Sequence, residues 1–276
     1  MDLSRVEDVK TAMKLAGIRP NKGLGQHFLV DSDSLQGIIA AAEPSFTDTV
    51  LEVGPGLGVM TRPLTQVAGQ VVAVETDAVL AELLRRDAPE NLQVVEQDIM
   101  EYELEQLPAG YKVIANIPYY LTSRLMRRLI ESANPPAVMS MLIQKEVAER
   151  IVAAPGRMSM LALSVQYYGT PEIALIVPRD RFWPAPDVDS AVLKVTLTGP
   201  AFPADTRKLF RLMKAGFGEK RKQLKNSLSG GLNIDMTAAT EMLATTGLTP
   251  TARAQELSLE QWQGLYAVAI KQELLP

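Results

Sequence analysis

Cysteine is missing from this 276-residue sequence, and histidine occurs only once, at His27. Without cysteine the chain can form neither a disulfide framework nor a thiolate metal site. A zinc ion would have to rely on carboxylates around a single imidazole, so we expect no metal in the protein. The absence of cysteine excludes scaffolds held together by disulfides, and together with the single histidine it argues against metal-dependent chemistry.

Long apolar runs are missing as well. The most apolar stretch, residues 137–143, is far too short to cross a bilayer. Residues 1–17 are amphipathic, carry Asp2, Glu7 and Asp8, and lack the apolar core of a signal peptide. The same acids argue against a transit peptide, so we expect a cytoplasmic protein with no membrane partner.

Excess positive charge is a third feature that the chain lacks, because its net charge is −4. The sum alone argues against a nucleic-acid partner, but the distribution of charge matters more. Residues 207–225 hold one acid, Glu219, among the cations Arg207, Lys208, Arg211, Lys214, Lys220, Arg221, Lys222 and Lys225. A smaller basic cluster consists of Lys10, Lys14, Arg19 and Lys22. Acidic residues elsewhere in the chain make the net charge negative, although these two segments are expected to form basic surfaces.

The 47% of hydrophobic residues is enough for one large α/β domain and a smaller appendage. Short β-branched runs alternate with segments of helical spacing, which predicts a parallel sheet covered on both faces. The predicted strands are residues 49–53, 71–75, 92–96, 111–116 and 137–143. The predicted helices are residues 32–42 with Asp31 or Ser32 as N-cap, a segment ending at 67, and residues 77–87, 122–132 and 145–153.

Two further strands, residues 173–177 and 191–198, leave no room for a crossover helix and should be antiparallel. Such an end is common in methyltransferase sheets, so we predict a Rossmann-like class I methyltransferase sheet with an antiparallel last strand. After Gly199-Pro200 the pattern is all-helical, with helices over residues 205–216, 220–228, 236–245 and 258–273. We predict a catalytic domain over residues 1–199, including an N-terminal helical extension, and a helical domain over residues 200–276.

A glycine turn, residues 52–58 (Glu-Val-Gly-Pro-Gly-Leu-Gly), follows the first strand of the alternation and opens a helix. Glycines let backbone approach a ligand, and a helix N-terminus offers free N–H groups. Glu75 ends the next strand, at the offset where an acid meets ribose hydroxyls. Asp98, after the third strand, can accept a hydrogen bond from an adenine amine. The same pattern suits a nicotinamide cofactor, and a tight turn that binds nothing is a further alternative.

Two features favour S-adenosylmethionine over a dinucleotide. Gly56-Leu57-Gly58 replaces the G-x-x-G spacing that a pyrophosphate needs. Glu52 places a carboxylate beside the turn, which would repel a pyrophosphate but tolerates a sulfonium cofactor with an ammonium group.

The tetrad Asn116-Ile117-Pro118-Tyr119 follows the fourth strand, at the edge of the sheet where ligands bind. The exocyclic amine of adenine is a poor nucleophile because its lone pair is spread into the ring. Two acceptors aimed at its hydrogens, the Asn116 side chain and the Ile117 carbonyl, would direct that lone pair at a methyl donor. Pro118 stiffens the turn and Tyr119 can stack on the base. The alternative is that these are ordinary turn and packing residues.

The sequence resembles the bacterial small-subunit rRNA adenine N6-dimethyltransferase family, which has relatives in archaea and eukaryotes. The likeness covers residues 21–262. The stretches that carry it are residues 25–29 (Gly-Gln-His-Phe-Leu), 52–58, 116–119, 144–150, 182–190, 217–228 and 253–258. The combination is specific, although the glycine turn alone is not.

The resemblance implies a role for each matching residue. Gly54 and its neighbours Glu52, Gly56 and Gly58 would hold S-adenosylmethionine, Glu75 its ribose and Asp98 its adenine. Asn116 would contact both the cofactor and the target amine, and His27 and Leu29 would close over the cofactor. The family usually has Asn where this chain has His27, whose imidazole can also form one hydrogen bond.

Phe182 falls on the second base-stacking position, so a flipped adenine would lie between Tyr119 and Phe182. Lys220, Arg221, Lys222 and Lys225 would bind the rRNA backbone. Family members place two methyl groups on each of two adjacent adenosines in the 3′-terminal hairpin loop of small-subunit rRNA, during ribosome biogenesis. We expect a monomer, since nothing in the sequence demands a dimer.

Two other functions stay open. The related large-subunit rRNA methylase that confers antibiotic resistance shares the glycine turn and the tetrad, whereas residues 182–190 and 253–258 favour the small-subunit enzyme. A non-catalytic factor in ribosome assembly or transcription is the alternative from another class, and the intact tetrad argues against it.

Overall fold

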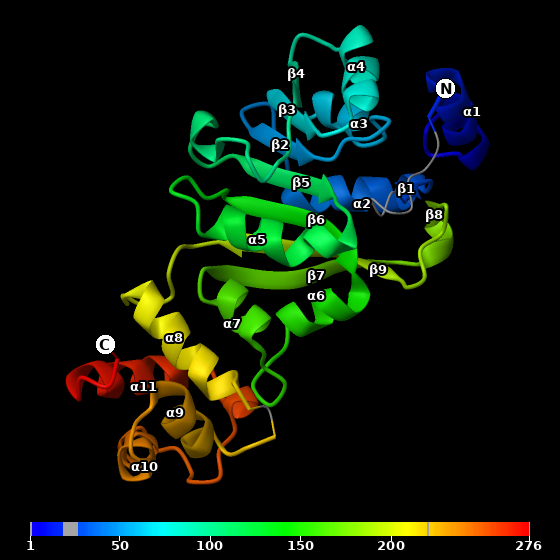
Figure 1. Cartoon of the computed structure of the whole chain (residues 1–276). Coiled ribbons are helices and arrows are strands. Elements are labelled where there is room, and N and C mark those ends of the chain that lie inside the picture. Colours follow the sequence, from blue (N-terminus) through cyan, green and yellow to red (C-terminus); the bar gives the residue numbers. More distant parts are fainter. Residues whose placement is uncertain (1, 19–26, 220, 276) are drawn as a thin grey trace. The chain divides into compact units, whose positions relative to one another are not determined.

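The structure is a computed structural model that describes residues 2–18, 27–219 and 221–275 (Figure 1). Some of the residues singled out above lie outside this part of the chain: Arg19, Lys22, Gly25, Gln26 and Lys220. The chain divides into two compact units. The first comprises residues 1–148 and 170–198, and the second comprises residues 149–169 and 199–276.

The first unit is built on a seven-stranded sheet of order β4-β3-β2-β5-β6-β9-β7. Its strands are β2 (Thr49–Val53), β3 (Gln70–Glu75), β4 (Leu92–Glu96), β5 (Lys112–Asn116), β6 (Val138–Gln144), β7 (Gly169–Val177) and β9 (Ser190–Leu197). Strands β4, β3, β2, β5 and β6 pair in parallel, and β9 runs antiparallel to β6. The predicted class I methyltransferase sheet with an antiparallel last strand is confirmed.

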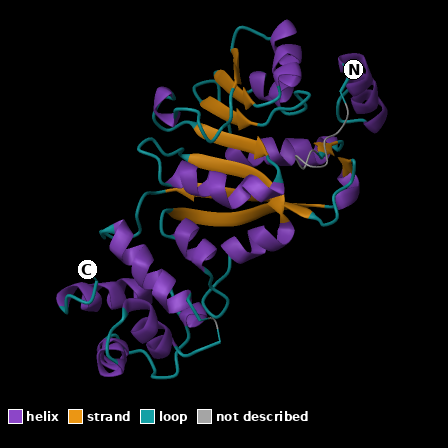
Figure 2. Ribbon diagram, in the orientation of Figure 1, coloured by secondary structure: helices purple, strands orange, loops and turns teal. Residues whose placement is uncertain are grey.

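Apolar side chains explain why the middle of this sheet is covered on both faces. Val50, Leu51, Val113 and Ile114 in β2 and β5 are fully buried, as expected of parallel strands packed between helices. The helices of this unit are α1 (Val6–Ala16), α2 (Ser32–Ala42), α3 (Thr61–Thr65), α4 (Ala78–Arg86) and α5 (Thr122–Ile130). Figure 2 shows these helices beside the orange strands.

The N-caps place the helices as the sequence predicts. Asp31 accepts a hydrogen bond from the Ser34 N–H, so α2 begins directly after it. Asp77 likewise accepts from the N–H groups of Val79 and Leu80 at the start of α4. Each carboxylate satisfies N–H groups that the first helical turn leaves without partners.

The second unit is all-helical apart from connecting loops. Helix α6 (Lys145–Ile151) crosses from one unit to the other, and α7 (Met160–Gln166), α8 (Thr206–Phe217), α9 (Leu224–Leu232), α10 (Met236–Thr245) and α11 (Leu259–Lys271) follow. Leu163 and Tyr167 share one apolar core with Leu212, Leu228 and Trp262. Residues 149–169 thus belong to the helical unit, whereas the predicted boundary at 199 places them in the catalytic domain. Their apolar side chains complete the helical core, which explains the difference.

Four local features differ from the sequence-based expectation. Strand β7 begins at Gly169, four residues before the predicted start at residue 173. Strands β1 (Phe28–Leu29) and β8 (Phe182–Trp183) form a small antiparallel sheet that was not predicted. Helix α7 was not predicted either. Helix α9 begins at Leu224 and not at residue 220, because Gln223 is extended and the Leu224 N–H donates to the Ala252 carbonyl at 2.7 Å.

Short one-turn helices complete the chain: η2 (Leu104–Gln106), η3 (Tyr119–Leu121), η4 (Arg179–Arg181) and η5 (Ala254–Glu256). Within the described ranges, none of the helices has the length and apolar character needed to cross a membrane.

Candidate active site

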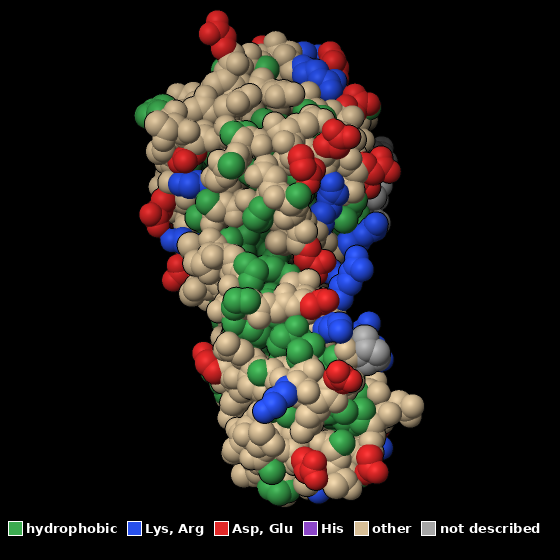
Figure 3. All heavy atoms as spheres, turned by 90° about the vertical axis from the view of Figure 1, so that its left-hand side faces the viewer, with side chains coloured by type: hydrophobic (Ala, Val, Ile, Leu, Met, Phe, Trp, Pro, Cys, Tyr) green, Lys and Arg blue, Asp and Glu red, His purple; other side chains and the backbone are tan. Residues whose placement is uncertain are grey.

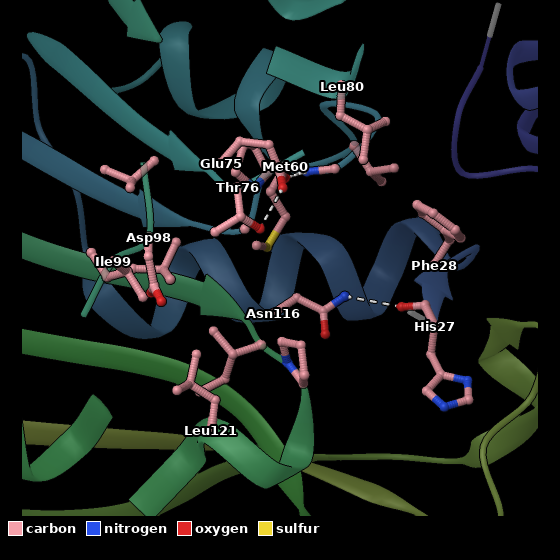
Figure 4. Close-up of a pocket in the computed structure, with 18 of the residues that line it drawn as sticks. His27, Phe28, Met60, Glu75, Thr76, Leu80, Asp98, Ile99, Asn116 and Leu121 are labelled. Carbon is pink, nitrogen blue, oxygen red and sulfur yellow. Dashed lines mark hydrogen bonds between the residues drawn. The ribbon is translucent and has the colours of Figure 1, made fainter. Parts of the chain in front are cut away.

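A cavity of about 250 Å³ opens at the carboxyl ends of the parallel strands β2, β3 and β5 (Figure 4). Parallel strands bring their carboxyl ends to one edge, which is where ligands bind in folds of this kind. Most of the residues predicted for the site line the cavity: His27, Leu29, Gly54, Gly56, Glu75, Asp98, Asn116, Ile117 and Pro118. The predicted residues Glu52, Gly58, Tyr119 and Phe182 are not among the lining residues found in the described chain.

The glycine turn forms one wall of the cavity. Gly54, Gly56 and Gly58 have φ values of 67°, 58° and 81°, a region that side chains other than glycine rarely adopt. A Cβ at Gly54 would meet only the Asn116 carbonyl oxygen, at 3.8 Å, so the turn leaves open space in front of it. A Cβ at Gly58 would instead lie 2.6 Å from Leu84 Cδ2, so Gly58 serves close packing against α4.

Glu75 joins the glycine turn to the end of β3. Its carboxylate is buried, and it accepts hydrogen bonds from the Gly56 N–H and the Asp77 N–H, both at 3.0 Å. Asp98, in contrast, is exposed and accepts from the Met100 N–H at 2.8 Å. The two carboxylates therefore line the same cavity, one held in place by backbone donors and the other open to solvent.

Asn116 lies in the middle of the cavity in Figure 4, with Glu75 on one side of it and Leu121 on the other. Its Nδ2 donates to the His27 carbonyl at 3.4 Å, which turns the side-chain oxygen away from Glu75. No hydrogen bond from another described residue reaches that oxygen or the Ile117 carbonyl. Asn116 Oδ1 thus lies in the cavity without a donor, and Ile117, whose carbonyl is also without one, lines the same cavity. Two free acceptors are the arrangement that an amino group requires.

Tyr119 points away from the lining and toward β9. Its hydroxyl shares a 2.8 Å hydrogen bond with the Ser190 hydroxyl, and its ring centroid lies 6.1 Å from that of His27. Burial raises the pKa of the Tyr119 hydroxyl, so it stays protonated in the neutral range. His27 is fixed in turn by a 2.8 Å contact between Nδ1 and the Pro184 carbonyl.

Phe182 is placed in the core of the first unit. Its side chain is 4% exposed and packs with Leu29, Ile38 and Val192. Strand β8 pairs Phe182 with Leu29, so the residue supports the cavity wall from behind.

Glu52 is fully buried beneath the glycine turn, and neither carboxylate oxygen has a hydrogen-bond partner among the described residues. Burial raises the pKa of Glu52 to about 8, and the nearby Glu75 carboxylate acts in the same direction. The carboxyl group is therefore largely protonated at pH 7. The predicted repulsion between Glu52 and a pyrophosphate requires a charged carboxylate. Because burial keeps this carboxyl group largely neutral, that repulsion is absent.

Several lining residues were not identified from the sequence. Met60, Ile99, Met100, Leu121, Tyr120 and Arg124 also face the cavity. Ile99 and Met100 directly follow Asp98, and Tyr120 and Leu121 directly follow the tetrad, so proximity to a predicted motif was the available signal. Met60 lies two residues after Gly58 and carries the same signal. Arg124 carries none, because only the folded helix α5 brings it to the sheet edge. Within the described chain, no three residues among His, Asp and Glu are placed to hold a metal ion.

A family model described as ribosomal RNA adenine dimethylase matches residues 17–271. The chain belongs to this family. A ribosomal RNA small subunit methyltransferase A from Dehalococcoides mccartyi is 40% identical over 272 residues, covering 96% of this chain and 94% of that protein. A protein of the same name from Streptococcus pneumoniae is 39% identical, covering 93% of this chain and 94% of its own length. The resemblance noted in the sequence is confirmed, and the chain is a methyltransferase by family.

Two solved structures have the same fold as this chain. A dimethyladenosine transferase from Plasmodium falciparum superposes with a TM-score of 0.75 at 24% identity, covering 88% of this chain and 97% of that one. The 23S rRNA methyltransferase ErmE superposes with a TM-score of 0.71 at 28% identity, covering 87% and 98%.

The basic segment of this dimethylase lies in the second unit. Arg221 and Lys222 are exposed between α8 and α9, Lys225 is half-buried on α9, and Lys222 pairs with Glu219. Lys220 lies outside the described residues. On the face drawn in Figure 3, acidic and basic side chains are interspersed, so the net charge of −4 does not describe the local surface.

Proposed function

We propose that this chain transfers methyl groups from S-adenosylmethionine to N6 of two adjacent adenosines in the 3′-terminal hairpin loop of small-subunit rRNA, two to each. Family membership and the names of the 37–40% identical relatives support the substrate and the reaction. The single observation that carries the proposal is that Asn116 and Ile117, each with an acceptor that no described donor reaches, line the same cavity as the glycine turn.

The residues present fit the cofactor. The open space in front of Gly54 would receive it, Glu75 would accept from its ribose hydroxyls, and Asp98 would accept from its adenine amine. His27 and Leu29 would close the cavity from the N-terminal side. When bound, the cofactor would supply a methyl group on a positively charged sulfur.

The tetrad would make the target amine nucleophilic by positioning. Asn116 Oδ1 and the Ile117 carbonyl would each accept one hydrogen of the amino group, which localises the nitrogen lone pair and aims it at the methyl donor. A strong base is unnecessary, because the nitrogen loses its proton only after it has gained the methyl group. The second methylation would need the monomethyl amine to rotate so that its remaining hydrogen meets one acceptor.

Tyr119 and Phe182 are proposed to hold the flipped base between their rings. Tyr119 is half-buried and Phe182 is buried in this structure, so the base can stack only after these rings become accessible. Arg221, Lys222 and Lys225, with Lys220, are proposed to bind the rRNA backbone, and residues 200–276 of the helical unit would form the rRNA-binding part.

Tritiated methyl transfer to unmodified small ribosomal subunits, followed by nucleoside analysis, tests the proposal. We expect the label in N6,N6-dimethyladenosine, at two methyl groups on each of two residues. Label in monomethyladenosine alone, or no label, would refute it.

A second candidate function is methylation of large-subunit rRNA, favoured by the 28% identity and the TM-score of 0.71 to the 23S rRNA methyltransferase ErmE. Unmodified small and large subunits, assayed side by side, separate the two. Incorporation confined to the large subunit would establish this second function in place of the first.

A further inference from the structure

Two side chains at the rim of the cavity have no part in the function proposed above. Tyr120 is 69% exposed although it lines the cavity, and Arg124 is an exposed residue that lines the same cavity. They are four positions apart, on η3 and the first turn of α5, and residues with that spacing lie on the same side of a helix. The rim therefore carries both an aromatic ring and a guanidinium group.

The three arginines of α5 are held in different ways. Arg127 forms an ion pair with Glu131, in which Nε and Oε2 are 3.0 Å apart. Arg128 donates to the carbonyls of Met100 and Tyr102, which ties α5 to the loop after Asp98. Arg124 has no ion-pair or hydrogen-bond partner in the described part of the chain. Its charge is thus uncompensated at the edge of a ligand cavity.

Tyr119 and Tyr120 are adjacent, but only Tyr119 is held by a hydrogen bond to another described side chain. Tyr119 turns inward, and its hydroxyl is bonded to Ser190. Tyr120 turns outward, and neither its ring nor its hydroxyl meets another described aromatic or polar group. Covering a ring of this size with a ligand would remove apolar surface from water, so the ring is available for stacking.

We infer that Tyr120 and Arg124 form a subsite for the nucleotide next to the target adenosine, the base stacking on Tyr120 and a phosphate meeting Arg124. This inference rests on the proposed function. Two adjacent adenosines must enter the cavity in turn, so the neighbour of whichever is inside must lie just outside, at the rim. Base stacking and a cation for phosphate are the two contacts that single-stranded RNA makes without regard to sequence.

The cofactor is a poorer occupant for the same pair. Its sugar and base are matched by carboxylates, Glu75 and Asp98, which line the cavity as acceptors. Its sulfonium and ammonium groups carry two positive charges against one carboxylate, so a guanidinium gains less from the cofactor than from a phosphate. The pair therefore acts as a positioning element for RNA in the geometry found here.

The test uses the full chain and intact, unmodified small subunits. Tyr120→Ala and Arg124→Ala should each raise KM for the subunit by roughly tenfold, the usual effect of losing one base stack or one phosphate contact. The value of kcat should change less than twofold, and the dissociation constant for S-adenosylmethionine, measured by calorimetry, should stay the same. Tyr120→Phe keeps the ring and should behave like the wild type.

Arg127→Ala is the matched control, because it removes an exposed arginine of the same helix that does not line the cavity. It should leave KM unchanged. A KM within twofold of the wild type in both alanine variants would overturn the inference, and so would a cofactor dissociation constant that rises with KM. Failure of the proposed function would be seen separately, as a wild-type protein that does not methylate small subunits.

Discussion

At the scale of single residues, Asn116 is the side chain on which the chemistry depends most directly. Replacing it by Ala removes one of the two acceptors, and we expect kcat to fall on the order of 100-fold or more while subunit binding is largely retained. Asn116→Asp keeps an oxygen at the same place and should retain more activity than the Ala variant. Single-turnover methyl transfer measures both.

A near-normal rate for Asn116→Ala would show that the tetrad does not hold the amine. Asn134→Ala is a useful control, since Asn134 donates to the carbonyls of Leu104 and Leu107 and does not line the cavity. It should lower stability without a selective loss of kcat.

Glu52 predicts a dependence of stability on pH. Its pKa is about 8 in the folded protein and 4.5 ordinarily, so between those values the folded chain binds more protons than the unfolded chain. Stability contributed by the neutral form is therefore complete below pH 4.5 and is lost as pH rises toward 8. Glu52→Gln removes this dependence.

Urea unfolding of the cofactor-free protein at pH 5 and pH 8 measures the difference. The free energy of unfolding should fall by roughly 2–4 kcal/mol more in the wild type than in Glu52→Gln over this interval. The exposed Glu90 supplies the control, because Glu90→Gln makes the same chemical change without burial. Equal pH dependence in all three proteins would rule out a buried, proton-retaining Glu52.

The residue scale also shows where sequence reasoning stops. Asn116, Glu75 and Asp98 could be placed in one cavity because each follows a predicted strand, and parallel strands end at one edge. Glu52 was assigned a charge that burial removes, and burial depends on packing that no local pattern reveals. The resemblance to the family predicted that Phe182 lies near the site. Its burial could not be predicted, because its strand partner Leu29 is 153 positions away in the chain.

At the scale of elements, the turn between β2 and α3 contains Gly58, for which there are two possible reasons to be glycine. One is the backbone conformation, and the other is the lack of space for a side chain. Gly58 and Gly110 have nearly the same backbone, with φ of 81° and 78°, but only at Gly58 would a Cβ meet another atom closely. Gly110→Ala should cost about 1 kcal/mol of unfolding free energy from backbone strain alone. Gly58→Ala should cost about 1 kcal/mol more, because the new methyl group overlaps Leu84.

Thermal unfolding of the two variants gives the comparison directly. Identical losses would mean that Leu84 moves aside freely and that backbone conformation alone selects glycine at position 58.

Long, periodic elements were predictable and short ones were not. The five parallel strands agree with prediction to within one residue at either end, because a β-branched run bounded by polar residues is a strong local signal. Strands β1 and β8 have two residues each, too few to show any period. Helix α7 follows Gly156 and the residues Arg157, Met158 and Ser159. Its apolar residues suit a strand or a helix equally well until the core of the second unit is known.

At the scale of the whole molecule, the basic residues predict how RNA affinity depends on salt. Replacing Arg221, Lys222 and Lys225 together by Ala should reduce the slope of log affinity against log salt by about 2, if each cation neutralises one phosphate. Affinity for S-adenosylmethionine should not change. Filter binding of small subunits over a range of salt concentrations provides the measurement.

The matched control removes three exposed cations of the first unit: Arg5, Arg62 and Arg86. It makes the same change in net charge. An equal change of slope in the control would mean that total charge, and not the segment between α8 and α9, governs RNA binding.

The small ladder between β1 and β8 has a consequence for synthesis of the chain. Residues 27–31 line and support the cavity, and they are held by contacts to residues 181–184, among them the Val30 N–H to the Arg181 carbonyl at 2.8 Å. A growing polypeptide carries the glycine turn, Glu75 and Asn116 long before it carries these later residues. The wall of the cavity formed by His27, Phe28 and Leu29 therefore cannot be held in place until residues 181–184 have been synthesised, so the cavity is completed late in translation.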